Sequence, residues 1–199
     1  MIAAVSLMRR SDGVSLDQFN RHWLTVHGPL VCAFAGLRAY AQYHVIGANA
    51  AGLAMRIDGF PILFFDNDSD RMLAHGSSEM AACDIDSRQF IGAVSRVITD
   101  VEVVVPRAAR SGGVPLIALY QEASAIGPHL DTLRAASGLT QYHVREQGGA
   151  PNSTVPRLPV IVGRIAQAWF DDEAARAAAM ARCDGPDVAL FAAREYWLA

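Results

Sequence analysis

The feature of this sequence that most constrains its fold is an internal repeat that spans most of the chain. Three groups of residues in the first half recur in the same order in the second half, with offsets of 102, 105 and 100 positions. The matched groups are His27, Gly36, Leu37 and Tyr40 with His129, Gly138, Leu139 and Tyr142; Phe65-Asp66 with Phe170-Asp171; and Met80, Cys83 and Asp84 with Met180, Cys183 and Asp184. Blocks in order with drifting offsets predict a duplication with loop insertions, and hence two similar halves.

A second alignment of the halves competes with the first. The run Gln42 to Val45 is identical to the run Gln141 to Val144, at an offset of 99. Because side chains alternate between the two faces of a strand, a shift of three residues reverses every face, so only one register can hold. We favour the offset of 102, which keeps the spacing between the histidine of the helix and the tyrosine of the strand.

Each half is expected to have the order strand, helix, strand, strand, helix, strand, which is ferredoxin-like. In the first half, Ser15 and Gln18 form a capping box that starts a helix. The expected strands are 2–8, 37–46, 60–65 and 97–105; Asp66-Asn67-Asp68 caps a second helical region that runs to Val94, and 106–113 is a linker. The predicted fold class is α+β, with repeats at 1–106 and 114–199 whose sheets form one barrel within the chain.

The second half is expected to be degenerate. If Ile2-Ala3 matches Ile117-Ala118, at an offset of 115, the second copy is 13 residues shorter in its first helical region and has no equivalent of Trp23. The sequence stops soon after Tyr196, which predicts at most a stub of the last strand. An open sheet edge there would favour pairing with another chain, so we expect a monomer or a homodimer, with a weak preference for the dimer.

Composition limits the chemistry. The 17 basic residues are all arginines, so a Schiff-base lysine, pyridoxal attachment and a phosphate-loop lysine are excluded. The net charge of −3 provides no basic field for nucleic acid or for an anionic membrane. Hydrophobic residues make up 52% of the chain, which is enough for a packed core.

Cysteine usage and the N-terminal sequence bear on location. The odd count, with Cys32, Cys83 and Cys183 far apart, predicts reduced thiols that act as small apolar fillers in a cytoplasmic protein. The first ten residues place their arginines after the apolar run, the reverse of a signal peptide, and no apolar run reaches 18 residues. We therefore expect a protein that is neither secreted nor embedded in a membrane.

The helix after Ser15 carries the motif Trp23-x-x-x-His27-Gly28-Pro29-Leu30. Its buried stripe is predicted to consist of Phe19, Trp23, Val26 and Leu30. Trp23 and His27 are four residues apart and would share one face, with His22 on the exposed side. Gly28-Pro29 is expected to end or bend the helix just past His27, because proline lacks the N–H that the helix needs.

The strand that follows has an unusual polar face. Tyr40, Gln42 and His44 alternate with apolar residues, so the three side chains lie on the same side of the strand. The small residues from Gly47 to Arg56 are predicted to form a long loop, a candidate lid or pocket rim.

These motifs resemble the EthD family. The residues that carry the resemblance are Trp23, His27, Pro29 and Leu30, then Gly36, Leu37 and Tyr40, the Asp58-Gly59 pair, and the aromatic-Phe-Asp end of a strand. The resemblance covers residues 1–106 well and residues 114–199 weakly. The resemblance implies the dimeric α/β-barrel arrangement and relatives such as methylmuconolactone methylisomerase and fungal polyketide dehydratases or decarboxylases, which work without metal or organic cofactor.

By this resemblance the candidate catalytic residues are His27, Tyr40 and His44. His27 could act as a general base or acid and Tyr40 as a hydrogen-bond donor to a carbonyl or oxyanion, with His44 as a second acid or base. Candidate substrate-binding residues are Trp23, Gln42 and Phe65. For His27 and its counterpart His129, a purely structural histidine in the core is the competing interpretation.

Three functions remain open. The first is a cofactor-independent isomerase or lyase acting on a small apolar ring compound or lactone. The second is a protein that binds such a ligand without converting it. The third is haem binding, which requires an axial histidine and a large cavity. A metal site built from His22, His27 and His44 is disfavoured, because no carboxylate pattern supports it, and we expect no cofactor.

Overall fold

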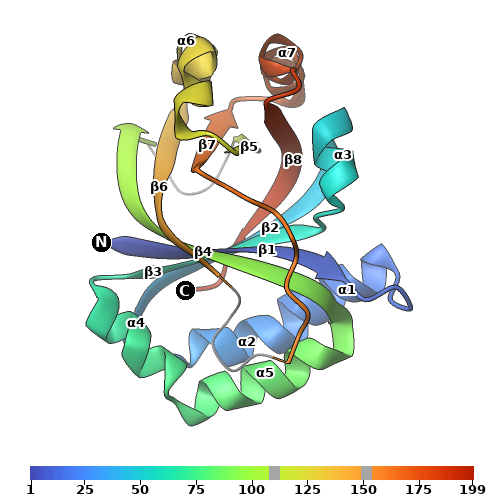
Figure 1. Cartoon of the computed structure of the whole chain (residues 1–199), viewed down its shortest axis with the longest axis vertical. Coiled ribbons are helices and arrows are strands. Elements are labelled where there is room, and N and C mark those ends of the chain that lie inside the picture. Colours follow the sequence, from blue (N-terminus) through green and yellow to red (C-terminus); the bar gives the residue numbers. More distant parts are fainter. Residues whose placement is uncertain (108–112, 149–153) are drawn as a thin grey trace.

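The computed structural model describes residues 1–107, 113–148 and 154–199. Its strands form a closed antiparallel barrel in the order β1-β3-β2-β8-β5-β7-β6-β4 (Figure 1). The strands are β1 (Ile2–Arg10), β2 (Leu37–Ala48), β3 (Gly59–Phe65), β4 (Ile91–Val105), β5 (Val114–Tyr120), β6 (Gly138–Gly148), β7 (Arg164–Phe170) and β8 (Val188–Trp197). The expected mixed α and β class and the barrel within one chain are confirmed.

Helical segments form two layers outside the barrel. In the first half they are α1 (Leu16–His22), η1 (Trp23–His27), α2 (Gly28–Cys32), α3 (Ala50–Met55), α4 (Asp68–His75) and α5 (Ser78–Phe90); in the second they are η2 (Ala123–His129), α6 (Leu130–Arg134) and α7 (Glu173–Cys183). Figure 1 shows α2, α4 and α5 on one side of the barrel and α6 and α7 on the opposite side. No helix in the described ranges combines the length and the apolar character needed to cross a membrane.

The two halves have the same strand order. The first contributes the neighbours β4-β1-β3-β2 and the second β8-β5-β7-β6, and the contacts β2–β8 and β4–β6 join them. The expectation of a stub at the end of the chain is wrong, because β8 is ten residues long and pairs with both β5 and β2. Tyr196 lies opposite Gln42 in that pairing, so the strand offers no open edge there.

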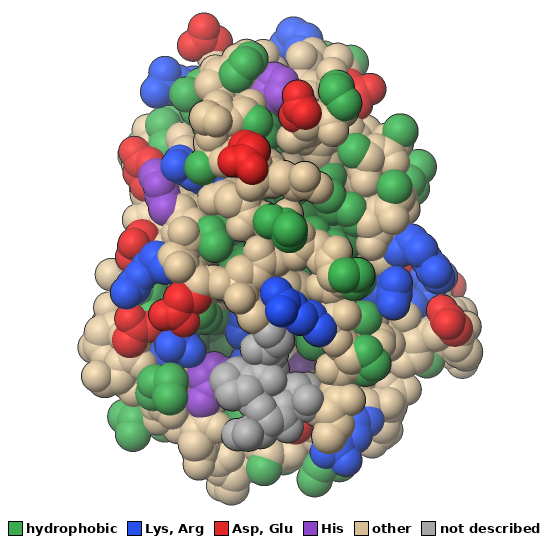
Figure 2. Space-filling view, viewed as in Figure 1, with side chains coloured by type: hydrophobic (Ala, Val, Ile, Leu, Met, Phe, Trp, Pro, Cys, Tyr) green, Lys and Arg blue, Asp and Glu red, His purple; other side chains and the backbone are tan. Residues whose placement is uncertain are grey.

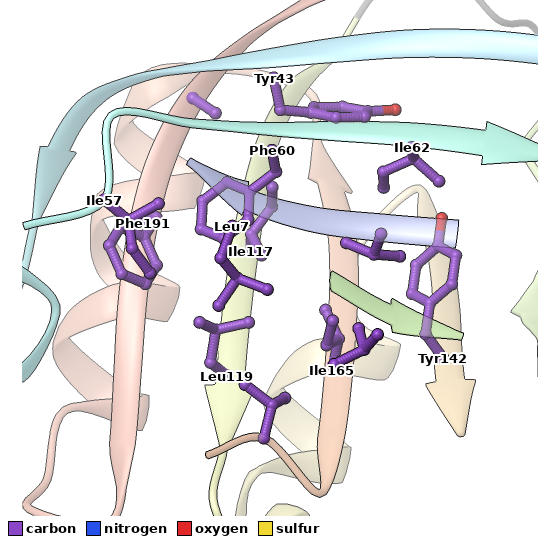
Figure 3. Close-up of a cluster of buried hydrophobic side chains, with 14 of the residues drawn as sticks. Leu7, Tyr43, Ile57, Phe60, Ile62, Ile117, Leu119, Tyr142, Ile165 and Phe191 are labelled. Atoms are coloured by element: carbon purple, nitrogen blue, oxygen red, sulfur yellow. The ribbon is translucent and has the colours of Figure 1, made fainter. Parts of the chain in front are cut away.

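Strand pairing decides between the two alignments of the halves, against the one we favoured. Tyr40 lies opposite Leu63 in the first half, and Leu139 lies opposite Ala168 at the equivalent point of the second. Tyr142 therefore corresponds to Tyr43, at an offset of 99, rather than to Tyr40. Both Tyr43 and Tyr142 belong to the cluster that fills the barrel (Figure 3), whereas Tyr40 faces the helices outside it.

The first strand needs the same correction. Ile2 pairs with Phe65 and Val114 pairs with Phe170, so β1 and β5 align at an offset of 112 rather than 115. The offset between the first strands and the offset between the second strands are each three smaller than expected. The second half therefore still has 13 fewer residues between its first and second strands. The match of Cys83 with Cys183 at an offset of 100 agrees with the structure, since both thiols are buried in the helices before the last strands.

Local signals predicted the first helix well up to Trp23. Ser15 caps α1, and the capping box with Gln18 is formed. The helix then widens into the π-helical segment η1, in which the N–H of Gly28 bonds to the carbonyl of Trp23, five residues earlier. The wider turn carries the chain through Gly28-Pro29 into α2, so the expected end at this pair is wrong.

The π-helical segment also changes which residues face inward. Phe19, Trp23 and His27 are buried on one face, as their spacing of four residues predicted, but Val26 is 45% exposed. The predicted stripe did not include the π-turn, which adds a residue to one turn and rotates the side chains that follow. Two other boundaries differ: the region 47–56 contains the helix α3, and β4 begins at Ile91, before the predicted strand start at Val97.

Candidate functional site

A small polar cavity lies between the helices and the outer face of the sheet in the first half. Its volume is about 60 Å³. The strands contribute Ser6, Tyr40 and Arg96 to its wall, and the helices contribute His27 and Asp84. The cavity thus brings together two of the three predicted catalytic residues, His27 and Tyr40.

His27 is held by a carboxylate that the sequence analysis missed. Its Nδ1 lies 2.8 Å from Oδ2 of Asp86 on α5, and the ring meets Phe90 edge-on. An ionised carboxylate only accepts hydrogen bonds, so Nδ1 carries the proton and Nε2 of the neutral ring is left as a proton acceptor. This is the arrangement in which a carboxylate orients a histidine base.

Asp86 also binds His22, through its Oδ1 at 2.8 Å. His22 is therefore a half-buried partner of the carboxylate, and its expected solvated position is wrong. Burial raises the pKa of Asp86, but the hydrogen bonds from His27 and His22 and their charges outweigh that effect, so the pKa is lowered overall. The carboxylate that orients His27 consequently stays ionised at neutral pH.

Tyr40 is fully buried, and its hydroxyl oxygen accepts two hydrogen bonds. Trp23 Nε1 donates over 3.1 Å and Gln42 Nε2 over 2.9 Å. A phenol oxygen has two lone pairs and one hydrogen, so two incoming donors leave its own hydrogen for an acceptor in the cavity. Burial raises the pKa of Tyr40, which keeps that hydrogen in place. Tyr40 is thus arranged to donate.

His44 lies behind this pair and does not line the cavity. It stacks on Trp23, with ring centroids 4.3 Å apart, and its Nε2 donates to Oε1 of Gln42 over 2.9 Å. Burial, aided by the charge of Arg194, lowers its pKa to about 4, so the ring is neutral at pH 7. His44, Gln42 and Trp23 thus form a connected set of side chains that holds the hydroxyl of Tyr40 in place.

The remaining predicted residues lie apart from the cavity. Phe65 packs in the apolar cluster beneath α2 and α5. In the second half, His129 contacts the hydroxyl of Tyr120 over 3.1 Å, and no Asp86 equivalent accompanies it. Cys83 lines the cavity, where burial first, with the charges of Asp86 and Asp84, raises its pKa to about 12, so it is a poor nucleophile.

Neither a metal ion nor haem fits this site. The described ranges contain no cluster of three potential metal ligands, and His44 stacks on Trp23 whereas His22 and His27 bind Asp86. A cavity of about 60 Å³ is also far below the roughly 300 Å³ at which ligand pockets of this kind begin.

The predicted rim near α3 borders a different pocket. This surface pocket measures about 380 Å³ and includes Gly47, Gly52 and Arg56 in its lining. Its charges are largely satisfied within the pocket, since Arg10 pairs with Asp58 and Arg56 with Asp12. We place the candidate site in the smaller cavity because the oriented histidine and the phenolic donor meet there.

Sequence reasoning overlooked both Asp86 and Arg96. Asp86 is one of two acidic residues in the second half of a helix and looked solvated, although it is only 7% exposed. Arg96 interrupts a strand of apolar and small residues from Ala93 to Ile98. A lone charge in such a strand is the signal that could have identified it.

Comparison with known proteins agrees with this description. Residues 11–93 match the EthD domain, the family that the motifs of the first half predicted. That match includes His27, Tyr40 and Asp86 and ends before Arg96. No curated protein matches the sequence.

Solved structures resemble the whole chain in fold. An anthrone oxidase-like protein has a TM-score of 0.62 at 8% identity and covers 98% of this chain and 92% of its own. A proposed monooxygenase from Fusobacterium nucleatum has a TM-score of 0.61 at 6% identity, covering 98% and 91%. A chlorite dismutase variant from Candidatus Nitrospira defluvii has a TM-score of 0.52 at 9% identity, covering 97% and 91%. These identities support a shared fold alone.

Proposed function

We propose that this chain is a small enzyme that moves a proton on a compact carbonyl compound in the cavity of the first half. The observation that carries the proposal is that the oriented base His27 and the free phenolic hydrogen of Tyr40 line the same cavity. His27 Nε2 would take a proton from a carbon next to the carbonyl, and Tyr40 would donate to the oxygen on which negative charge develops.

The reaction type depends on the step after this proton transfer. Returning the proton to another carbon gives an isomerisation, and expelling hydroxide gives a dehydration. A decarboxylation uses the same groups in reverse, with Tyr40 at the oxygen and His27 returning a proton to the carbon that loses carbon dioxide. These are the isomerase and lyase reactions expected from the sequence, and none of them needs a cofactor. Trp23, Gln42 and His44 would position Tyr40 rather than touch the substrate.

The substrate must be small, and the cavity must widen to admit it. Ligand pockets commonly measure about 300–1,000 Å³, well above the present cavity. Met8 and Met80 line it, and their unbranched side chains can change conformation at low cost. We propose a single ring or lactone with mostly apolar atoms as the substrate.

We further propose that the chain consists of two ferredoxin-like repeats, 1–106 and 114–199, of which only the first retains a site. The shared strand order supports a duplication. Closure of the barrel within one chain leaves both a monomer and a homodimer compatible with this function.

Solvent deuterium exchange provides a direct test. A thermal-shift screen of small ring carbonyl compounds in D₂O would supply ligands, and NMR would follow deuterium entering each one. We expect exchange to fall by about 10²–10⁴-fold in His27→Ala and by about 10²–10³-fold in Tyr40→Phe, with a smaller loss in Asp86→Asn. The matched control, His129→Ala, removes the histidine of the second half and should exchange at the parent rate.

Two outcomes would contradict the proposal. One is a folded His27→Ala protein that exchanges and converts its substrate at the parent rate. The other is a ligand that binds the cavity with no exchange and no turnover, which would instead identify a ligand-binding protein. Oxygen uptake is measured in the same assay, because the fold neighbours include an anthrone oxidase-like protein and a carbanion can also react with dioxygen.

A further inference from the structure

Arg96 is an unusual member of the cavity wall. It lies on β4 opposite Ser6 of β1, and its side chain points to the helix side of the sheet. The same residue also lines a neighbouring cavity of about 130 Å³, with Arg71 and His75. Figure 2 shows basic, acidic and histidine side chains near one another on the lower part of this face of the molecule.

The guanidinium of Arg96 has only neutral partners. Its Nε donates to Oγ of Ser6 over 3.3 Å, and its Nη1 lies 3.5 Å from Nε2 of His75. Burial, followed by the charges of Arg96 and Arg71, lowers the pKa of His75 to about 4, so that ring is uncharged at pH 7. In the described part of the chain, no carboxylate forms an ion pair with Arg96, and an arginine has five N–H donors to satisfy.

Two acidic residues line cavities together with Arg96: Asp84 on α5 in the first cavity and Glu146 in the neighbouring one. Burial lowers the pKa of Arg96, and the attraction of Asp84 opposes that shift. The hydrogen bonds of Arg96 go to Ser6 and His75 rather than to Asp84. Asp84 therefore leaves the donors of Arg96 free, although it would weaken the binding of an anion beside it.

The second half shows that the fold does not require an arginine at this position. The strand pair equivalent to β1 and β4 is β5 and β8, where Ala118 and Leu190 occupy the positions of Ser6 and Arg96. Both residues are buried in one apolar cluster. Arg96 is half-buried, and partial removal of a charge from solvent without an ion-pair partner is costly, so Arg96 needs a reason other than packing.

We propose that Arg96 binds a carboxylate of the substrate, which makes the substrate an organic acid. This inference rests on the proposed function, because it places the carboxylate in the cavity where His27 and Tyr40 act. The planar fork of donors on a guanidinium matches the two oxygens of a carboxylate. The carboxylate would hold the ring, and the carbonyl would face Tyr40.

Binding of simple acids tests the proposal without any turnover. The probes are acetate, propionate and benzoate, each compared with its amide, in NMR titrations of the full chain at constant ionic strength. We expect at least one acid to bind ten times or more tightly than its amide, and Arg96→Leu to abolish that preference. The matched control, Arg38→Leu, removes an exposed arginine that pairs with Asp66 and should leave it intact.

Two further variants keep the test decisive if Arg96→Leu folds poorly. Arg96→Gln removes the charge with a smaller change in shape and should also lose the preference. Asp84→Asn removes the neighbouring negative charge and should tighten acid binding several-fold. The inference is overturned if none of the three acids binds in preference to its amide, or if Arg96→Gln binds the acids like the parent.

The two proposals can fail separately. Acid binding and deuterium exchange are measured independently, so either one can be lost without the other. Acid binding through Arg96 without deuterium exchange on any carbonyl compound would overturn the proposed function alone. Exchange that survives in Arg96→Gln at the parent rate and affinity would overturn the role of Arg96 alone.

Discussion

The two helical layers cover the same barrel with opposite chemistry. At equivalent strand positions, the first half has polar residues and the second half has apolar ones. Ser6, Tyr40 and Arg96 correspond to Ala118, Leu139 and Leu190. The second layer has one apolar cluster, which includes all three apolar residues. The first layer splits into two apolar clusters with the polar cavity beside them.

This difference separates what the fold needs from what a site needs. Buried polar groups stabilise a fold less reliably than apolar ones, and at these three positions the second half has apolar residues instead. The polar residues of the first layer therefore call for a function, and the second layer serves as a control within the same molecule.

The largest expected effect concerns Trp23, which has no equivalent in the second layer. Trp23→Ala should destabilise the protein by about 3–5 kcal/mol, because it empties a fully buried position. It should also remove a donor from Tyr40 and so weaken any cavity ligand. Leu133→Ala in α6 is the matched change in the second layer, with an expected cost of about 2–5 kcal/mol and no effect on the ligand.

Urea unfolding and ligand titration of both variants measure this contrast. Equal losses of ligand affinity in Trp23→Ala and Leu133→Ala would mean that the two layers are coupled, and the comparison between them would fail.

Acid should destabilise the first layer in particular. The pKa of His44 falls from the usual 6.5 to about 4 on folding, chiefly through burial and then through Arg194. Between pH 6.5 and pH 4, His44 therefore binds a proton in the unfolded chain but not in the folded chain. The contribution of His44 to the free energy of unfolding is complete above pH 6.5 and declines as the pH falls to 4. For the nearly buried His44, this loss is at most about 3 kcal/mol.

Urea unfolding at pH 7, 6 and 5 measures this decline. His44→Gln should reduce the slope, because glutamine does not titrate, and His75, whose pKa is also lowered to about 4 by burial and then by Arg96 and Arg71, should account for part of what remains. A steeper slope in His44→Gln than in the parent would refute the assignment.

The sequence predicted much of this first layer and little of its detail. The repeat, the capping box and the alternation of Tyr40, Gln42 and His44 come from local signals that are readable one element at a time. The register between the halves was wrong, because an offset chosen from helix spacing ignores the strand pairing that fixes side-chain faces. The π-turn at Trp23 was also missed, and with it the exposure of Val26, whereas His27 shares the buried face of Trp23 as its spacing predicted.

The site was predicted in part for a similar reason. His27 and Tyr40 stand out as residue types within motifs. Asp86 and Arg96 matter through contacts across 59 and 90 positions of sequence, to His27 and Ser6 respectively. Such contacts follow from packing rather than from any local pattern.

A smaller effect distinguishes the buried hydroxyls of the two layers. Tyr40→Phe leaves the indole N–H of Trp23 without an acceptor, an expected cost of about 1–3 kcal/mol. Tyr120→Phe removes a single contact to the part-buried His129, with an expected cost of about 1 kcal/mol or less. Thermal unfolding of both proteins measures the difference, and a larger loss in Tyr120→Phe would contradict the picture of Tyr40 as the hub of the first layer.

The smallest expected effect is a difference in alkylation rate between two matched thiols. Cys83 and Cys183 have equivalent places in α5 and α7, both are nearly inaccessible, and burial raises the pKa of each. They differ in their surroundings, because Cys83 lines the cavity and Cys183 lies in the apolar cluster of the second layer. If the cavity widens to admit a substrate, Cys83 should be alkylated several times faster than Cys183 in the native protein, and a cavity ligand should slow Cys83 alone. Mass spectrometry of a Cys32→Ser background, which removes the most exposed thiol, gives the two rates. Equal rates would mean that the first layer opens no more readily than the second, and a cavity of its present size would then be too closed to serve as an active site.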